Sequence, residues 1–126
     1  MNTDYKKETL SSVIEVPKDD LDWWESLLLS DDVDYEANGF AKYACVWWKT
    51  AKFPDGCEVD VKVCTDSDED RDVWSEAVLF DENGCQLACT EVCDTLRGEW
   101  ELEWFDRKAN TMHVYNVKIV DAKEGN

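Results

Sequence analysis

The stretch Cys57-Glu-Val-Asp-Val-Lys-Val-Cys64 decides the fold class. Its valines alternate with charged residues, and a period of two is typical of a β-strand with one buried and one solvated face. The stretch 98–105, Gly-Glu-Trp-Glu-Leu-Glu-Trp-Phe, alternates in the same way. Pro54-Asp-Gly56 and Glu82-Asn-Gly84 supply the residues that tight hairpin turns prefer. The sequence therefore predicts strands joined mainly as hairpins.

A helix precedes the predicted strands. Leu21, Trp24 and Leu28 recur with helical spacing, and Pro17 is tolerated at the first turn of a helix. We therefore expect a helix over 18–30. After this helix, alternating residues and turn residues predict six strands, at about 42–53, 57–64, 73–81, 85–91, 98–105 and 111–120.

These elements predict an α+β fold in which one N-terminal helix packs on a six-stranded, mostly antiparallel, curled sheet connected as a meander. The polar residues 1–16 are expected to form a flexible N-terminal arm, and 17–126 a single domain. Val13 to Val16 could add a short edge strand to this arrangement.

Charge is the strongest indication of function. The chain has 126 residues, of which 30 are acidic and 13 basic, so its formal net charge is -17. With 44% hydrophobic residues, including seven tryptophans, it can nevertheless build a core and does not resemble a disordered polyanion. An anionic surface repels nucleic acid and lipid headgroups and attracts basic proteins. We therefore expect a basic partner protein, with no direct nucleic-acid contact and no membrane contact.

Two acidic groups are candidate binding elements, the loop Asp66-Ser-Asp-Glu-Asp-Arg-Asp72 and the alternating row formed by Glu99, Glu101 and Glu103. Same-face residues on a strand are ~6.8 Å apart, whereas phosphates on one DNA strand are ~3.4 Å apart along the axis. Like charges placed opposite each other destabilise a sheet, so stability does not account for the row. Solubility alone or adaptation to high salt remains the alternative explanation. The candidate partner-binding residues are Asp66, Asp68, Glu69, Asp70, Asp72, Glu99, Glu101, Glu103, Glu58, Asp60 and Trp48.

Trp48 joins this set because of the pair Trp47-Trp48. Neighbouring residues on a strand point to opposite faces. The commoner arrangement is a central strand buried on both faces. In the alternative, one indole is exposed and acts as an anchor within an acidic rim, since tryptophan is enriched among interface hot spots.

Six cysteines raise the question of disulfides or metal. The first 15 residues lack the features of a signal peptide, which predicts a cytoplasmic protein with free thiols. The array Cys85-x3-Cys89-x3-Cys93 suggests zinc, but its thiols would be too far apart on an extended strand. The acidic loop lacks the glycine and glutamate of an EF-hand, having Arg71 and Ala77 at those positions. We expect no metal and no cofactor.

Catalytic motifs are also missing from the sequence. There is no glycine-rich phosphate loop, nucleophile elbow or metal-binding HExxH helix. His113 is the sole histidine, and no cysteine-protease signature surrounds any cysteine. We therefore expect that the protein is not an enzyme.

Small size, strong acidity and the lack of catalytic motifs together resemble the small acidic inhibitors that imitate nucleic acid, such as phage anti-CRISPR and anti-restriction proteins. The resemblance implies a stoichiometric inhibitor in the host cytosol that occupies the nucleic-acid groove of a larger basic enzyme, such as a nuclease or effector complex. It implies that the acidic loop and the glutamate row replace phosphates. The alternative is a small cysteine-rich zinc or structural accessory module that acts through protein–protein contacts, and a homodimer remains open.

Overall fold

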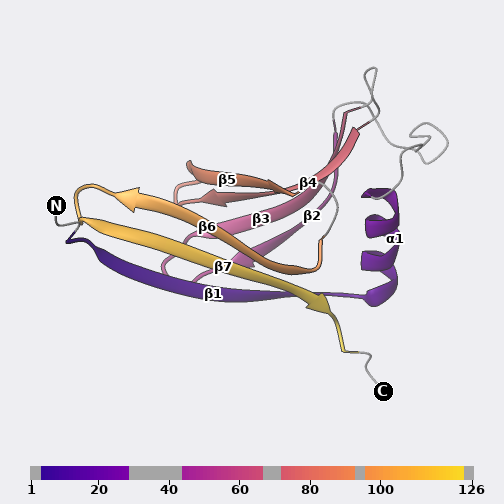
Figure 1. Cartoon of the computed structure of the whole chain (residues 1–126), viewed down its shortest axis with the longest axis horizontal. Coiled ribbons are helices and arrows are strands. Elements are labelled where there is room, and N and C mark those ends of the chain that lie inside the picture. The colour runs from indigo at the N-terminus through magenta and orange to yellow at the C-terminus, as the bar shows by residue number, and fades with distance from the viewer. Residues whose placement is uncertain (1–3, 29–43, 67–71, 93–95, 124–126) are drawn as a thin grey trace.

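The computed structural model describes residues 4–28, 44–66, 72–92 and 96–123 (Figure 1). Within these ranges the chain forms one helix and seven strands. In chain order they are β1 (Lys6–Val16), α1 (Lys18–Leu28), β2 (Ala44–Lys52), β3 (Glu58–Asp66), β4 (Asp72–Phe80), β5 (Gln86–Val92), β6 (Gly98–Asp106) and β7 (Thr111–Asp121).

The described strands form two sheets. One is four-stranded and antiparallel in the order β2-β3-β4-β5, and the other is three-stranded in the order β1-β7-β6. The expected α+β fold, with one helix on a single six-stranded sheet, is therefore wrong: the described residues are mostly β-strand and divide between two sheets. The six expected strands nevertheless all exist close to their predicted bounds. The chain leaves the first sheet after β5. Leu96 is fully buried in the core there, and Gly98 opens β6 with a φ of 118°, which only glycine adopts easily.

The N-terminal segment is the second correction. Residues 6–16, expected in a flexible arm, form β1 and pair in parallel with β7 from Lys6↔Thr111 to Val16↔Asp121. On this strand only Ile14 and Val16 are buried, and the first half of the strand is polar and mostly exposed. Local hydrophobicity is therefore too weak to reveal an element that depends on a strand about 100 positions later in the chain.

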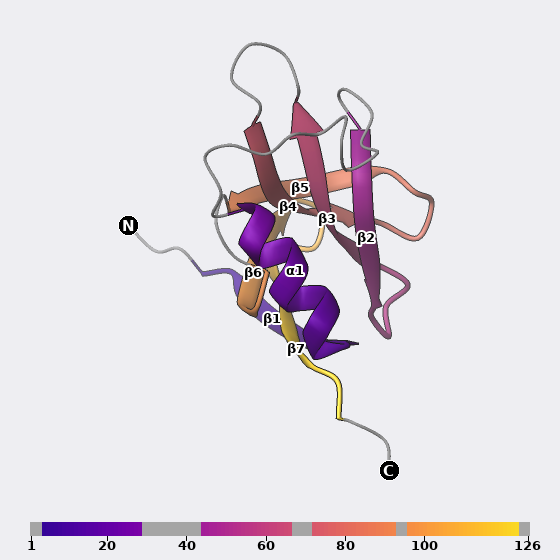
Figure 2. The ribbon, with the colours of Figure 1, turned by 90° about the vertical axis from the view of Figure 1, so that its right-hand side faces the viewer.

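The two sheets pack face to face around one hydrophobic core. Val59, Val61 and Val63 of β3 point into it, as do Leu102 of β6 and Val117 of β7. Figures 1 and 2 show α1 lying across one end of the molecule, between the ends of the two sheets.

α1 closes this end of the core through the face that its sequence predicts. Leu21, Trp24 and Leu28 are buried, and the ring centroids of Trp24 and Trp47 are 6.4 Å apart. Residues 29 and 30, which were also expected in the helix, lie outside the described ranges. In the part of the chain that the structure describes, no helix is both long and apolar enough to cross a membrane.

Tyr115 joins the sheets near the opposite end. Its hydroxyl donates a hydrogen bond of 2.6 Å to Asp55 in the turn between β2 and β3 and lies 3.4 Å from the Cys57 sulfur. The ring meets Phe53 edge to face at 5.0 Å. Burial and the hydrogen bond to Asp55 raise the pKa of Tyr115, and burial raises the pKa of the Cys57 thiol. This tyrosine is a cross-sheet link, and Cys57 is part of the core.

Candidate functional site

The glutamate row predicted from the sequence lies on the outer face of the three-stranded sheet. Glu99, Glu101 and Glu103 are exposed, while Trp100 and Leu102 between them are buried in the core. The alternation of β6 therefore has the predicted orientation, with carboxylates on one side and the core on the other. We call these three residues the β6 glutamate row.

The neighbours of the β6 glutamate row on β7 leave most of its charge uncompensated. In the register of the two strands, Glu99 pairs with Lys118, Glu101 with Asn116 and Glu103 with Val114. Among the described residues, no ion pair involves any of the three glutamates. Their charge is thus available to a molecule approaching from solvent.

The row is part of a larger outer surface. It continues into Phe105, which is 39% exposed and meets Tyr5 edge to face at 5.7 Å. A shallow pocket of about 150 Å³ spans all three strands beside the row. Its side chains include Ser11, Val13, Glu99, Asn116 and Lys118. The outer face of this sheet therefore offers carboxylates, aromatic edges and a small depression together.

Glu58 and Asp60 do not share this surface. They lie on β3, where they alternate with buried valines and so face outward from the four-stranded sheet, on the other side of the core. Asp60 accepts a 2.7 Å hydrogen bond from the Thr50 hydroxyl, and Glu58 pairs with Lys52 in the register of β2 and β3. The structure therefore separates these two candidates from the β6 glutamate row.

Trp48 is 60% exposed because its side chain points away from the core, on the face of the sheet opposite to the buried valines of β3. Trp47 points to the other side and packs against the core. The expectation of a strand buried on both faces is wrong, because one indole is exposed; its role as a binding anchor stays a prediction. Trp48 pairs in register with Lys62, whose amine lies 3.3 Å from Glu76. It therefore shares the outer face of the four-stranded sheet with Glu58 and Asp60.

The acidic loop is described only at its two ends. Asp66 and Asp72 are directly opposite each other in the ladder of β3 and β4. The backbone thus brings these two predicted residues together. Asp68, Glu69 and Asp70 lie outside the described residues.

The cysteine array is partly described. β5 is extended, with Cys89 exposed on it and Cys85 exposed in the turn before it, while Cys93 lies outside the described ranges. Residues four apart on a strand are separated by about 13 Å, which is too far for two ligands of one zinc ion. Among the described residues, no three His, Cys, Asp or Glu side chains are grouped to hold a metal.

His113 lies apart from the cysteines, on the core-facing side of β7. Its ring stacks on Trp104 with centroids 5.1 Å apart. Nδ1 is 3.8 Å from a carboxylate oxygen of Glu8, and Nε2 is 4.0 Å from one of Asp106. The side chains of Trp104, Glu8 and Asp106 next to this histidine are thus aromatic and acidic.

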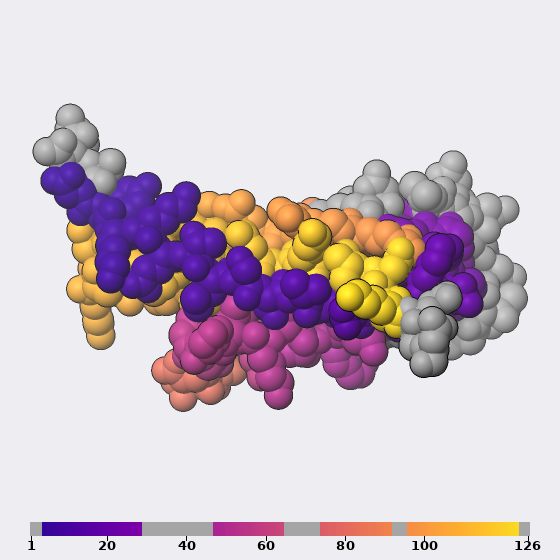
Figure 3. Space-filling view, turned by 90° about the horizontal axis from the view of Figure 1, so that it is seen from below, coloured from indigo at the N-terminus to yellow at the C-terminus, as the bar shows by residue number. Residues whose placement is uncertain are grey.

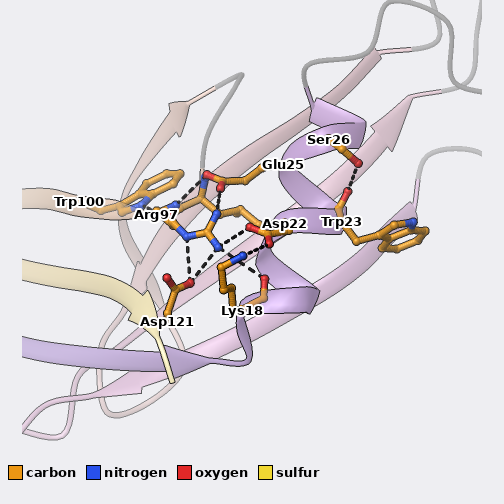
Figure 4. A network of polar contacts seen from close by, with 9 residues as sticks. Lys18, Asp22, Trp23, Glu25, Ser26, Arg97, Trp100 and Asp121 are labelled. Carbon is orange, nitrogen blue, oxygen red and sulfur yellow. Dashed lines mark hydrogen bonds and ion pairs between the residues drawn. The ribbon is translucent and has the colours of Figure 1, made fainter. Parts of the chain in front are cut away.

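Arg97 is the organising residue that the sequence did not reveal (Figure 4). Its guanidinium contacts the carboxylates of Asp22, Glu25 and Asp121. Glu25 also accepts hydrogen bonds from the backbone N–H groups of Leu96 and Arg97, at 3.0 and 3.2 Å. These partners raise the pKa of Arg97 against the opposing effect of desolvation.

The Arg97 network fixes the start of β6, and with it the β6 glutamate row, against α1 and the end of β7. No local motif predicts it, because Arg97 and Glu25 are 72 residues apart in the sequence.

Comparison of the chain with protein-family models, with curated proteins and with solved structures gives no match.

Proposed function

We propose that this protein is a non-enzymatic inhibitor that binds a basic nucleic-acid-binding protein and competes with its nucleic acid. The observation that carries the proposal is the β6 glutamate row, in which three exposed carboxylates follow one edge strand without an ion pair among the described residues. Their spacing of ~6.8 Å is about twice that of the phosphates along one DNA strand. Lysine and arginine side chains that contact phosphates can therefore bind the carboxylates instead.

The net charge of -17 supports the same mechanism at longer range. A uniform excess of negative charge accelerates encounter with a basic partner, and salt screens this attraction. At physiological ionic strength the screening length is about 8 Å, so contacts at the row rather than distant charges set the affinity. We place this activity in the cytoplasm, where such partners work on nucleic acid.

The experiment compares two variants of equal net charge. Glu99→Gln, Glu101→Gln and Glu103→Gln together neutralise the row, whereas the control combines Asp20→Asn, Glu82→Gln and Glu91→Gln at exposed positions outside the three-stranded sheet. Each immobilised protein captures proteins from a bacterial lysate at low salt. Bound proteins are then released with duplex DNA or single-stranded RNA and identified by mass spectrometry.

We expect the wild type and the control to retain nucleic-acid enzymes that either oligonucleotide releases, and the row variant to retain at least about tenfold less. Equal capture by the two variants would show that the row is not the binding site. Capture that no oligonucleotide reverses would contradict competition with nucleic acid.

A second candidate function rests on the 60% exposure of Trp48. An exposed indole on an edge strand is suited to an accessory module that assembles through apolar protein–protein contacts. The variant Trp48→Ala distinguishes the two candidate functions, because Trp48 lies on the four-stranded sheet and the β6 glutamate row lies on the three-stranded sheet. Loss of binding in this variant, with retention in the row variant, favours the accessory module.

A further inference from the structure

β6 is the edge strand of its sheet. The order β1-β7-β6 leaves β7 as its partner on one side, and no other described strand pairs with it. The three-stranded sheet also extends beyond the four-stranded sheet at the end opposite α1 (Figures 1 and 3). The edge of β6 that faces away from β7 therefore presents backbone N–H and C=O groups that a further strand can pair with, most openly at its C-terminal end.

The two faces of β6 differ in chemistry along this edge. The outer face carries Glu99, Glu101 and Glu103, while Trp104 on the inner face is half-buried against the core. A strand added beside β6 would place alternate side chains next to these two kinds of neighbour. Charge complementarity then requires basic residues on the outer face, and the indole favours apolar or β-branched residues on the inner face.

We propose that the edge of β6 binds an extended basic segment of the partner as an additional strand. Lysine or arginine at every second position of that segment pairs with the β6 glutamate row, and residues such as valine or threonine between them pack beside Trp104. This inference rests on the proposed function, because both use the same three glutamates. It goes further in stating that the partner offers a strand and not a rigid phosphate-binding groove.

The geometry favours a strand over a basic helix. Same-face residues of a strand recur every ~6.8 Å, which is also the spacing of the glutamates along β6. A helix satisfies its own backbone groups and cannot bond with the sheet edge, whereas strand addition uses main-chain hydrogen bonds for affinity and side chains for specificity.

The test uses the full chain and four synthetic ten-residue peptides of identical charge. The first alternates lysine with valine and threonine. The second has the same composition with its lysines contiguous. The third keeps the alternating sequence but has N-methylated peptide bonds at every second residue, which removes the hydrogen-bond donors on one edge. A fourth peptide, N-methylated at the other residues, removes those on the opposite edge.

Calorimetry measures each affinity, and hydrogen exchange locates the contact. The alternating peptide should bind about tenfold more tightly than the contiguous one, and at least one methylated peptide should lose that advantage. Binding of the alternating peptide should slow hydrogen exchange of the β6 amides. The variant that combines Glu99→Gln, Glu101→Gln and Glu103→Gln should bind this peptide more weakly, while the charge-matched control variant should bind it as the wild type does.

Equal binding by the alternating, contiguous and both methylated peptides would overturn the inference, as would a complete lack of binding or protection confined to β2. Each of these results leaves the competition experiment unaffected. If capture from the lysate is reversed by oligonucleotide while the peptides show no preference, the partner uses a groove. If the peptides behave as expected but capture is not reversible by oligonucleotide, the surface binds strands without mimicking nucleic acid.

Discussion

The hydroxyl of Tyr115 on β7 lies 2.6 Å from a carboxylate oxygen of Asp55, and this contact connects the three-stranded sheet to a turn of the four-stranded sheet. Partial burial of Asp55 would raise the pKa of its carboxyl group. Hydrogen bonds from Tyr115 and from the Cys57 backbone N–H outweigh that effect, and the pKa is lowered. The two sheets are therefore joined by a polar contact that depends on an ionised carboxylate.

Removing the Tyr115 hydroxyl should weaken the contact between the two sheets. We expect Tyr115→Phe to lower the free energy of unfolding by about 1–2 kcal/mol, because a charge-assisted hydrogen bond is lost while the ring still packs on Phe53. Urea denaturation followed by tryptophan fluorescence measures this. Tyr5→Phe, at an exposed tyrosine, is the matched control and should change stability by less than about 0.5 kcal/mol. Equal effects would show that the contact contributes nothing.

Acidic pH should weaken the same contact between Tyr115 and Asp55. The folded pKa of Asp55 is below its unfolded value of about 3.9, so the unfolded chain binds more protons between the two values. The stabilisation from Asp55 is therefore fully present above about pH 5 and is lost as the pH falls through the folded pKa. Asp55→Asn cannot titrate, so its unfolding free energy should fall less steeply than that of the wild type below pH ~4. Parallel curves in acid would contradict this role for Asp55.

Arg97 should hold the helix in place. Arg97→Ala leaves Asp22, Glu25 and Asp121 without their shared cation, and we expect a loss of about 1–2 kcal/mol, since the guanidinium is only 29% exposed. Hydrogen exchange of α1 amides should accelerate more than exchange in β3.

Arg107→Ala, at an exposed position, is the control and should change stability by less than about 0.5 kcal/mol. If the α1 amides of Arg97→Ala exchange as slowly as those of the wild type, the network does not fasten the helix.

Truncation of two tryptophans should change the free energy of unfolding by very different amounts. Trp48→Ala should leave the unfolding free energy within about 0.5 kcal/mol of the wild type, because its indole is 60% exposed. Trp100→Ala should cost about 3–5 kcal/mol, since its ring is buried and its Nε1–H donates to the Leu96 carbonyl at 3.1 Å. Thermal denaturation followed by circular dichroism distinguishes them. A large loss in Trp48→Ala would mean that the outer face of β2 is structural.

Local patterns predicted α1 and the strands β2 to β7, but neither β1 nor the assembly of the strands into sheets. The alternation of Val59, Val61 and Val63 identified a strand because one face of each sheet is buried. No local pattern distinguishes one six-stranded sheet from two smaller sheets. That choice depends on β6 pairing with β7 and not with β5, and on β1 pairing with a strand far along the chain.

The candidate site was likewise predictable only where it depends on local patterns and not on how the strands assemble. The exposure of Glu99, Glu101 and Glu103 was predictable, because charged residues that alternate with Trp100 and Leu102 must face solvent. The separation of Glu58 and Asp60 from that row was not, since it depends on which sheet each strand joins. Arg97 was missed for a similar reason, as three carboxylates distant in sequence define its role.

The parallel pairing of β1 with β7 has a consequence for synthesis of the protein. β1 leaves the ribosome about 100 residues before the strand that completes its hydrogen bonds. Until β7 is made, the nascent chain has no partner strand for β1, whose exposed edge can pair with another chain. The lysines and glutamate at the start of β1 oppose such pairing, so they protect a folding intermediate as well as the finished molecule.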